Sequence, residues 1–312
     1  MQILSLKDLI SPLSVEEFFQ KHWPRTPLFI SAVTGKLHDV FQLKQLQSLE
    51  NLVDARFDKV RACLPDFDDE YSSILIDPKD ALKAYRNNMT LVFDSMQHQD
   101  TYIAKSLLQI KHDLGLISGP DHDLCRARSI AYATPAGGGT RMHFDANANF
   151  IIQIQGSKQW TLAPNRSVTD PTERFTVGSY VMPAALEKQC HDLLIDEPPE
   201  DSYEVEMTVG SVLFVPRGYW HATTTHEDSL SLNFTFSQPS WADVFTKSMQ
   251  EWLLNSPDWR ALADGLESAE PLRKERAIEQ FEMLLKDLSL KLPEISGRQL
   301  LIESGLLKSN RD

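Results

Sequence analysis

The chain has 312 residues, and its 31 lysines and arginines stand against 44 aspartates and glutamates, which gives a formal net charge of −13 with histidine neutral. So acidic a composition argues against a protein that coats nucleic acid through a basic surface. Hydrophobic residues make up 42% and charged residues 24% of the chain, as in ordinary globular proteins, and the length allows one large domain or two smaller ones.

No segment is typical of an export signal or a membrane span. The N-terminal stretch lacks a basic region followed by an apolar one, and no later apolar run approaches the roughly 20 residues that cross a bilayer. The cysteines Cys63, Cys125 and Cys190 are odd in number and form no C-x-x-C pair, so neither a disulfide framework nor a thiolate zinc site is expected. We therefore predict a cytoplasmic protein that does not contact membranes.

The first hundred or so residues are predicted to form mainly helices and loops. Ser14 and Glu17 have the spacing of a capping box, which predicts a helix beginning there. Residues 80–85 and 102–110 carry apolar side chains at helical spacing. We expect these segments to form a helical layer around a core.

From Ser129 onward the sequence is typical of short strands, rich in β-branched and aromatic residues and separated by Gly or Pro. The predicted strands are 129–134, 150–155, 158–162, 211–215 and 230–236. A tight hairpin is expected around Gly156, and no helical segments of the kind that join parallel strands intervene. An antiparallel sandwich or barrel follows, with residues 165–201 predicted to form a long insertion over its rim.

Residues 240–312 are predicted to be helical. Ser240 and Asp243 occupy capping-box positions, and a second helix begins at Pro271. That helix carries an apolar stripe formed by Ile278, Phe281, Leu284, Leu285 and Leu288. We therefore divide the chain into 1–239 and 240–312, and expect the stripe either to form a homodimer interface or to pack on the chain's own β core.

Three side chains are candidate metal ligands. His143 and Asp145 are two residues apart, and such residues share one face of a strand. His221 follows a segment typical of a strand, a Pro/Gly turn and a return strand, so it could reach the same place. Two imidazoles and one carboxylate suit non-haem Fe(II) and leave positions open, whereas zinc prefers tetrahedral closure. An isolated His-x-Asp pair is more often structural, and His226 is the serious competitor of His221.

Lys158 is a candidate anion-binding residue. Its default interpretation is a solvated lysine after a turn. However, it has the same strand parity as Trp160 and Leu162, so it faces the interior if that bulky pair does. A buried ammonium group needs an anion, which a dicarboxylate cosubstrate could supply. Thr140, three residues before His143, could add a hydroxyl group to the same carboxylate.

The order and spacing of these motifs resemble the JmjC, or cupin-like, branch of the Fe(II)/2-oxoglutarate oxygenases. The motifs are Thr140-x-x-His143-x-Asp145, Asn149-Phe150, Gly156-x-Lys158, Pro-x-Gly-x-Trp-His221 and Asn233-Phe234. Residues 132–139 and 15–24 are more similar to the bacterial ribosomal-oxygenase subgroup. That subgroup often has Arg where this chain has Lys158, and a lysine at this position is closer to the asparaginyl-hydroxylase and demethylase pattern.

The resemblance implies a double-stranded β-helix, or jelly-roll, barrel wrapped by N-terminal helices, with a C-terminal helical region. It also implies a role for each motif residue. His143, Asp145 and His221 would bind Fe(II), Lys158 and Thr140 would hold the distal carboxylate of 2-oxoglutarate, Asn149 and Asn233 would lie near its iron-bound end, and Tyr132 would line the same pocket.

The activity implied by the resemblance is hydroxylation of a protein or peptide side chain by O2, with release of succinate and CO2. Three alternatives remain: hydroxylation of a small molecule or natural product at the same iron, demethylation of an N-methyl group, and a non-catalytic cupin-type metal-binding module. Thr140 and Lys158 argue against the last, because a mere metal binder needs no cosubstrate anchor. The negative net charge weakly favours a basic partner.

Overall fold

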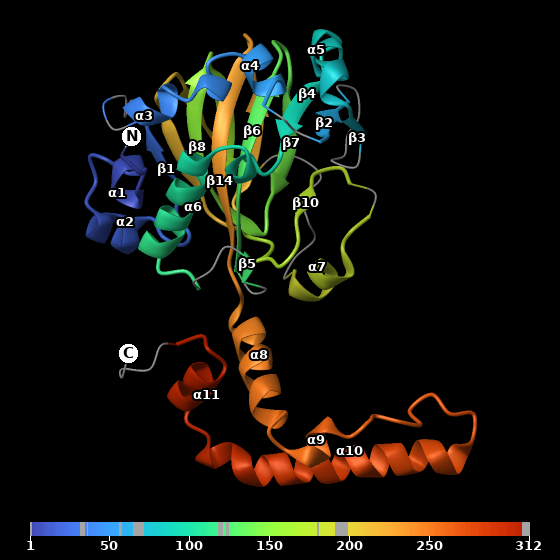
Figure 1. Ribbon diagram of the computed structural model, residues 1–312. Helices are drawn as coiled ribbons and strands as arrows, with labels where there is room; N and C mark the ends of the chain where they lie inside the picture. Colours follow the sequence, from blue (N-terminus) through green and yellow to red (C-terminus); the bar gives the residue numbers. More distant parts are fainter. Residues whose placement is uncertain are drawn as a thin grey trace. The chain divides into compact units, whose positions relative to one another are not determined.

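The computed structural model of the chain divides into two compact units, Met1–Gln238 and Pro239–Asp312 (Figure 1). The structure describes residues 2–31, 35, 37–55, 58–64, 72–117, 121–122, 125–179, 181–190 and 199–307. For residues 121–122 it describes the backbone alone. Each unit is described by itself below.

The larger sheet of the first unit is antiparallel and has nine strands. Across the sheet they are β1 (Leu28–Ile30), β12 (Val212–Val215), β8 (Asn147–Gln155), β14 (Ser229–Ser237), β6 (Cys125–Thr134), β4 (Thr90–Phe93), β2 (Val60–Cys63) and β3 (Ser73–Ile76), with β5 (Asp121–His122) paired to β6. Figure 1 shows β14 running between β8 and β6. The strands β1 to β4 come from the segment predicted to be mainly helices and loops. That prediction was wrong there because strands of three or four residues are too short to display a period of two.

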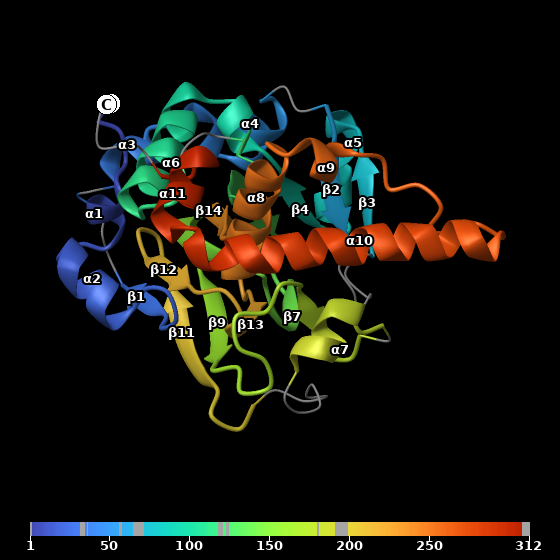
Figure 2. The same cartoon turned by 90° about the horizontal axis from the view of Figure 1, so that it is seen from below.

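The smaller sheet has five strands and is also antiparallel. Its order is β10 (Phe175–Thr176), β7 (Gly139–Phe144), β13 (Trp220–Thr224), β9 (Lys158–Ala163) and β11 (Tyr203–Met207). Figure 2 shows β7, β13, β9 and β11 from below. Two antiparallel sheets with helices on the outside confirm the predicted jelly-roll type of core. β10 and α7 (Ala184–Gln189) belong to the insertion predicted at 165–201, of which residues 180 and 191–198 lie outside the described part.

The chain crosses from one sheet to the other at Gly156. Because β8 belongs to the larger sheet and β9 to the smaller, the hairpin predicted here is wrong. Gly156 has a φ of +62°, and a Cβ at this position would lie 2.0 Å from the backbone oxygen of Asp228. The glycine is therefore required by a close backbone approach at the crossing, a role that a sequence reader cannot distinguish from a hairpin turn.

Helices of the first unit pack on the larger sheet. They are α1 (Leu6–Leu9), α2 (Val15–Lys21), α3 (His38–Phe41), α4 (Leu49–Val53), α5 (Pro78–Arg86) and α6 (Thr101–Asp113), with 3-10 turns at Lys44–Leu46 and Met96–His98. The predicted capping box begins α2, with the Ser14 hydroxyl accepting from the Glu17 amide at 3.1 Å. One turn later, the Phe18 ring lies 6.0 Å from that of Phe150 and 5.2 Å from that of Phe214, centroid to centroid. Burial of each such ring stabilises the fold by roughly 2–3 kcal/mol.

The space between the two sheets is only partly apolar. Its apolar part is a small buried cluster formed by Ile151, Trp160, Leu162, Met207, Leu213 and Val215. The rest of the inner face carries polar side chains, which is unusual for a sandwich core and indicates a site.

The second unit consists of helices. They are α8 (Trp241–Leu253), α9 (Pro257–Arg260), α10 (Pro271–Lys291) and α11 (Gly297–Glu303), with a 3-10 turn at Leu292–Glu294. The capping box predicted at Ser240 and Asp243 begins α8. α8 contacts α11 through the hydroxyl groups of Ser248 and Ser304, 3.0 Å apart. Among the described helices none has both the length and the apolar character needed to cross a bilayer.

Candidate active site

The three candidate metal ligands come from two neighbouring strands of the smaller sheet. His143 on β7 lies directly opposite His221 on β13 in the antiparallel register, and Asp145 follows just after β7. The possible ligand atoms of these three side chains all lie within 4.8 Å of one another. The Nε2 of His221 lies 3.6 Å from an Oδ of Asp145. The structure therefore brings together the three residues that the sequence singled out, whereas His226 is exposed beyond the end of β13.

Backbone carbonyl groups orient both imidazoles. The Nδ1 of His143 lies 2.7 Å from the carbonyl oxygen of Arg141, and the Nδ1 of His221 lies 2.9 Å from that of Tyr219. A carbonyl can only accept, so each Nδ1 carries the proton and donates it. The Nε2 lone pairs are then available to a metal, which is the usual arrangement of metal-binding histidines.

The charge states of the cluster suit metal binding. Burial lowers the pKa of His143 well below its usual value and also lowers the pKa of His221, so both imidazoles are neutral at pH 7. Burial alone would raise the pKa of Asp145, but His143, Arg174 and His221 outweigh it and hold that pKa below its ordinary value. Neutral imidazoles and an ionised carboxylate are the forms that coordinate metal ions.

Lys158 has a buried ammonium group beside this cluster. The residue is 5% exposed, and it lies on β9 in the same inward register as Trp160 and Leu162, as the strand parity predicted. Its Nζ donates to the hydroxyl of Thr134 at 3.2 Å, and no carboxylate of the described residues is within ion-pair distance. Burial lowers the pKa of Lys158 to about 8. A charged group held in this way among neutral partners is expected to receive an anion.

One cavity connects the histidine cluster with Lys158. Its volume is about 110 Å³, and both sheets line it. The lining residues are Tyr132, Thr140, His143, Asp145, Asn149, Ile151, Lys158, Trp160, Arg174, Val215, His221, Thr223, Ser231 and Asn233. All eight residues predicted for the site are therefore in one place.

The four remaining predicted residues have different surroundings. The Thr140 hydroxyl is 3.0 Å from that of Thr223, and Thr140 is the most exposed of the four. The Asn149 amide donates to an Oδ of Asp145 at 3.2 Å, which holds the carboxylate in place. Tyr132 is half-buried, and burial raises the pKa of its hydroxyl. Asn233 is buried, and its Oδ1 has no hydrogen-bond partner within the described part of the chain.

Asn233 is not alone in having a buried polar atom without a partner in this cavity. The Nε1 of Trp160 is in the same position among the described residues, and the Trp160 ring stacks on that of His221 with centroids 5.8 Å apart. Buried polar atoms are nearly always hydrogen-bonded in native proteins. An orphaned donor and acceptor next to a buried ammonium group therefore fit a polar, anionic ligand.

Arg174 was missed by the sequence reasoning. Its Nη1 lies 3.7 Å from the Oδ1 of Asp145, and its side chain lines the cavity from the insertion. Arg174 directly precedes the two-residue strand β10. In the sequence it stands in a Pro- and Thr-rich stretch without strand or helix periodicity, so no local signal pointed to it.

Part of the chain matches a known protein family. Residues 116–244 match the family model described as JmjC domain. An uncharacterized protein of Bacillus subtilis, YxbC, is 28% identical over 303 residues, covering 95% of this chain and 89% of that protein. The Drosophila simulans protein named bifunctional lysine-specific demethylase and histidyl-hydroxylase NO66 is 27% identical over 181 residues, or 58% of this chain. This chain spans only 19% of that relative's length.

The solved structures show the same fold. The Escherichia coli ribosomal oxygenase YcfD, in complex with cobalt and succinic acid, superposes with a TM-score of 0.50 at 14% identity, covering 88% of this chain and 67% of that one. A cluster of two histidines and one aspartate with open positions is the arrangement that binds Fe(II) in 2-oxoglutarate oxygenases. The family match and this cluster agree with the predicted cofactors. Residues 116–244 thus carry a JmjC domain, and the chain is similar in sequence to proteins named ribosomal oxygenase and NO66.

Proposed function

We propose that this protein is an Fe(II)- and 2-oxoglutarate-dependent oxygenase that hydroxylates a side chain of a protein or peptide. In the overall reaction one atom of O2 becomes the new hydroxyl group and the other enters succinate, while CO2 leaves. The observation that carries the proposal is the position of Lys158, a buried cation that has no carboxylate partner among the described residues and shares one cavity with the ligand cluster. A protein that only binds metal has no need of such a group.

Each cavity residue then has a task. His143, Asp145 and His221 hold the metal, which when bound supplies the site for O2 activation with electrons from 2-oxoglutarate. Lys158 binds the distal carboxylate of the cosubstrate, and Thr140 adds a hydroxyl group to it. Asn149 donates a hydrogen bond to Asp145 and so fixes the orientation of the carboxylate that would bind the metal. Asn233 and Tyr132 contribute polar contacts on the opposite sheet.

A protein substrate is supported by the names of the relatives. NO66 is named as a histidyl-hydroxylase and lysine-specific demethylase, and YcfD as a ribosomal oxygenase. Both names refer to chemistry on macromolecules. Demethylation and small-molecule hydroxylation remain as outcomes of the test below. The cytoplasmic location and the absence of nucleic-acid binding stay predictions from the sequence.

Turnover of 2-oxoglutarate provides the first test. The full chain with Fe(II), ascorbate and O2 is expected to form succinate, and a bacterial lysate should raise the rate because coupled turnover exceeds the uncoupled reaction. Mass spectrometry with ¹⁸O2 should find one labelled oxygen atom on a protein side chain. Loss of a methyl group instead would indicate demethylation, and label only in small molecules would indicate the alternative hydroxylase. No succinate under any condition would contradict the oxygenase proposal.

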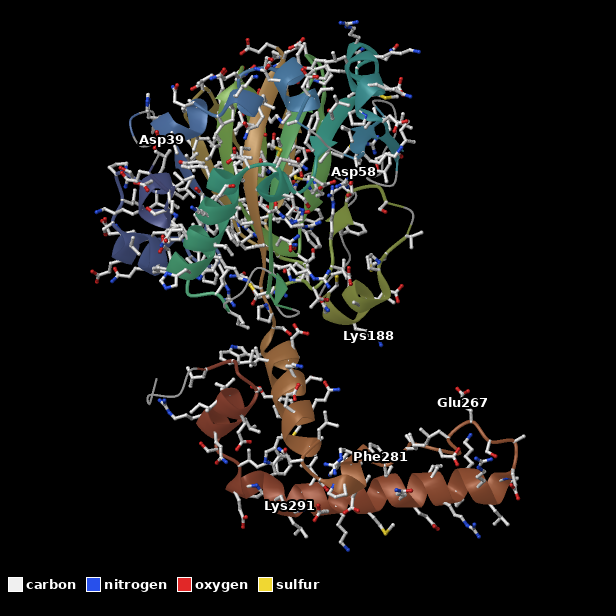
Figure 3. The ribbon with its side chains drawn as sticks, in the orientation of Figure 1. Asp39, Asp58, Lys188, Glu267, Phe281 and Lys291 are labelled. Atoms are coloured by element: carbon white, nitrogen blue, oxygen red, sulfur yellow. The ribbon has the colours of Figure 1, made fainter. Side chains whose placement is uncertain are left out.

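The apolar side chains of α10 lead to a second proposal, that two copies of the chain associate through this helix. α10 has 21 residues and no buried residue, and Phe281 and Leu285 are 51% and 45% exposed. Figure 3 labels Phe281 on this helix. A helix of this length without a covered face is marginal in water. We expect Leu285→Glu to shift the full chain toward the monomer in sedimentation velocity, whereas Met283→Glu on the opposite face should not. A wild-type monomer at all concentrations would exclude the dimer.

A further inference from the structure

A second cavity lies on the same three strands of the larger sheet as the active-site cavity. It has a volume of about 380 Å³ and is lined by Arg126, Arg128, Asn147, Thr235 and Ser237. These residues belong to β6, β8 and β14, the three adjacent strands that also line the active-site cavity. None of them has a role in the function proposed above.

Strand parity places both cavities along one face of the larger sheet. On β8, Asn147 is two residues from Asn149, and on β14, Thr235 is two residues from Asn233, so each pair points to the same side. The Thr235 hydroxyl donates to the Oδ1 of Asn149 at 2.8 Å, and Asn149 in turn donates to Asp145. Two hydrogen bonds therefore join the metal-ligand carboxylate to the wall of the second cavity.

The second cavity is cationic. Arg126 and Arg128 lie on the same side of β6, and both side chains are exposed within a chain whose net charge is −13. No carboxylate with a described side chain forms an ion pair with either guanidinium. Asp94, which influences Tyr132 at the active-site end of the sheet, is already paired with Arg61. Two arginines concentrated in one cavity of an acidic protein create a local field opposite in sign to that of the whole molecule.

Of the two arginines, Arg128 has the neighbour without a charge in the sheet. Its backbone partner on β14 is Thr235, which has no charge, whereas the partner of Arg126 on β5 is Asp121. Guanidinium groups bind carboxylates in a bidentate manner, with two parallel hydrogen bonds. The Asn147 amide adds a neutral polar group to the same cavity, whereas the hydroxyl groups of Thr235 and Ser237 already donate to Asn149 and to the Arg126 carbonyl.

We propose that this cavity binds an acidic side chain of the peptide substrate and so selects substrates that carry Asp or Glu near the oxidised residue. The inference rests on the proposed function and specifies its substrate class. In the sheet, Thr235 is the register partner of both Asn149 on β8 and Arg128 on β6. Because neighbouring strands lie about 4.8 Å apart, the Cα atoms of Arg128 and Asn149 are roughly 10 Å apart. An extended peptide covers that distance in about three residues. Because Asn149 contacts the metal ligand Asp145, we expect the acidic residue to lie a few positions from the oxidised one.

This local charge reverses the expectation drawn from the whole chain. The net charge of −13 favoured a basic partner, but it is spread over the surface and is screened beyond about 8 Å at physiological salt. A substrate inside the cavity is in contact with Arg128 itself. Contact electrostatics, and not net charge, then decide which peptide is accepted.

Peptide binding without turnover tests the inference. The full chain with Mn(II) and 2-oxoglutarate is titrated into short random peptides that carry a central glutamate, glutamine or phosphoserine and a neutral dye, and anisotropy is measured. The glutamate pool is expected to bind about ten-fold more tightly than the glutamine pool. Arg128→Gln should remove this difference, whereas Arg86→Gln on α5, with the same loss of charge, should keep it. Thermal unfolding checks that both variants are folded.

The remaining outcomes are decisive as well. Equal binding of the glutamate and glutamine pools to the wild type, or an unchanged preference in Arg128→Gln, would refute the acidic-substrate site. A preference for phosphoserine alone would assign the cavity to phosphate and overturn the carboxylate proposal. Because the assay needs no turnover, selective glutamate binding without succinate formation would contradict the oxygenase and leave the acidic site standing.

Discussion

Asp145→Ala is expected to reduce Fe(II)-dependent succinate formation by on the order of 100-fold or more. The carboxylate is the anionic member of the ligand cluster, and without it two neutral imidazoles remain beside Arg174, whose Nη1 lies 3.7 Å from the Asp145 Oδ1 in the native protein. A cation repels a second cation, so the variant should also lose the stabilisation that Mn(II) gives to the wild type in thermal unfolding.

His226→Ala is the matched control for the ligand cluster. His226 is exposed and lies five residues beyond His221, so its removal should change neither the metal response nor turnover. His143→Ala should behave like Asp145→Ala. Full activity in either ligand variant, with a normal unfolding curve, would remove that residue from the metal site.

Lys158→Met is expected to act in opposite directions on stability and on cosubstrate binding. The pKa of Lys158 is about 8 in the fold against 10.5 for a free lysine, so burying the charge costs on the order of 3 kcal/mol at neutral pH. Methionine fills a similar space without charge, and the metal-free variant should be more stable than the wild type by up to this amount. Affinity for 2-oxoglutarate should fall about 10- to 100-fold, because a charge-assisted hydrogen bond is lost.

The pH dependence of this stability difference has a defined sign. Because the folded-state pKa lies below the unfolded one, the unfolded chain binds more protons between pH 8 and 10.5, and wild-type stability gains relative to Lys158→Met as pH rises. The advantage of the variant is therefore complete below pH 8 and disappears toward pH 10.5. Cosubstrate affinity of the wild type should weaken above about pH 8, where Lys158 loses its proton.

Lys158→Arg separates charge from shape at this position. It keeps the cation, so 2-oxoglutarate binding should be closer to wild type than in Lys158→Met, and no gain in stability is expected. Denaturant unfolding at several pH values and calorimetric titration of 2-oxoglutarate measure both quantities. A methionine variant that is less stable than the wild type and still binds 2-oxoglutarate normally would show that Lys158 is not the anion anchor.

Features that depend on near neighbours in the chain were predictable. The capping boxes at Ser14 and Ser240 need only residues three apart, and both begin helices. The inward position of Lys158 followed from the period of two along its strand. The eight predicted site residues line one cavity, because each motif occurs at a strand end or at a fixed parity, and the family resemblance supplied the pairing between distant motifs.

Features that depend on strand pairing were not predictable from the chain alone. Glycine at Gly156 is compatible with a hairpin and with a crossing between sheets, and only the contact with Asp228 across the fold decides between them. The short strands β1 to β4 exist because each pairs with a strand that comes from elsewhere in the chain or from a neighbouring segment, as β4 does with β6 and β1 with β12. No local sequence pattern predicts either the crossing at Gly156 or the pairing of these strands.

The sequence by itself therefore determined which residues could bind iron and an anion, since residue type and strand parity are local properties. Only the tertiary structure decided that Arg174 reaches Asp145, and that Arg126 and Arg128 line a cavity whose wall is hydrogen-bonded to Asn149 beside the metal site. The reason is that charges far apart in the chain act on one another through distances in space, which the pairing of β6, β14 and β8 sets.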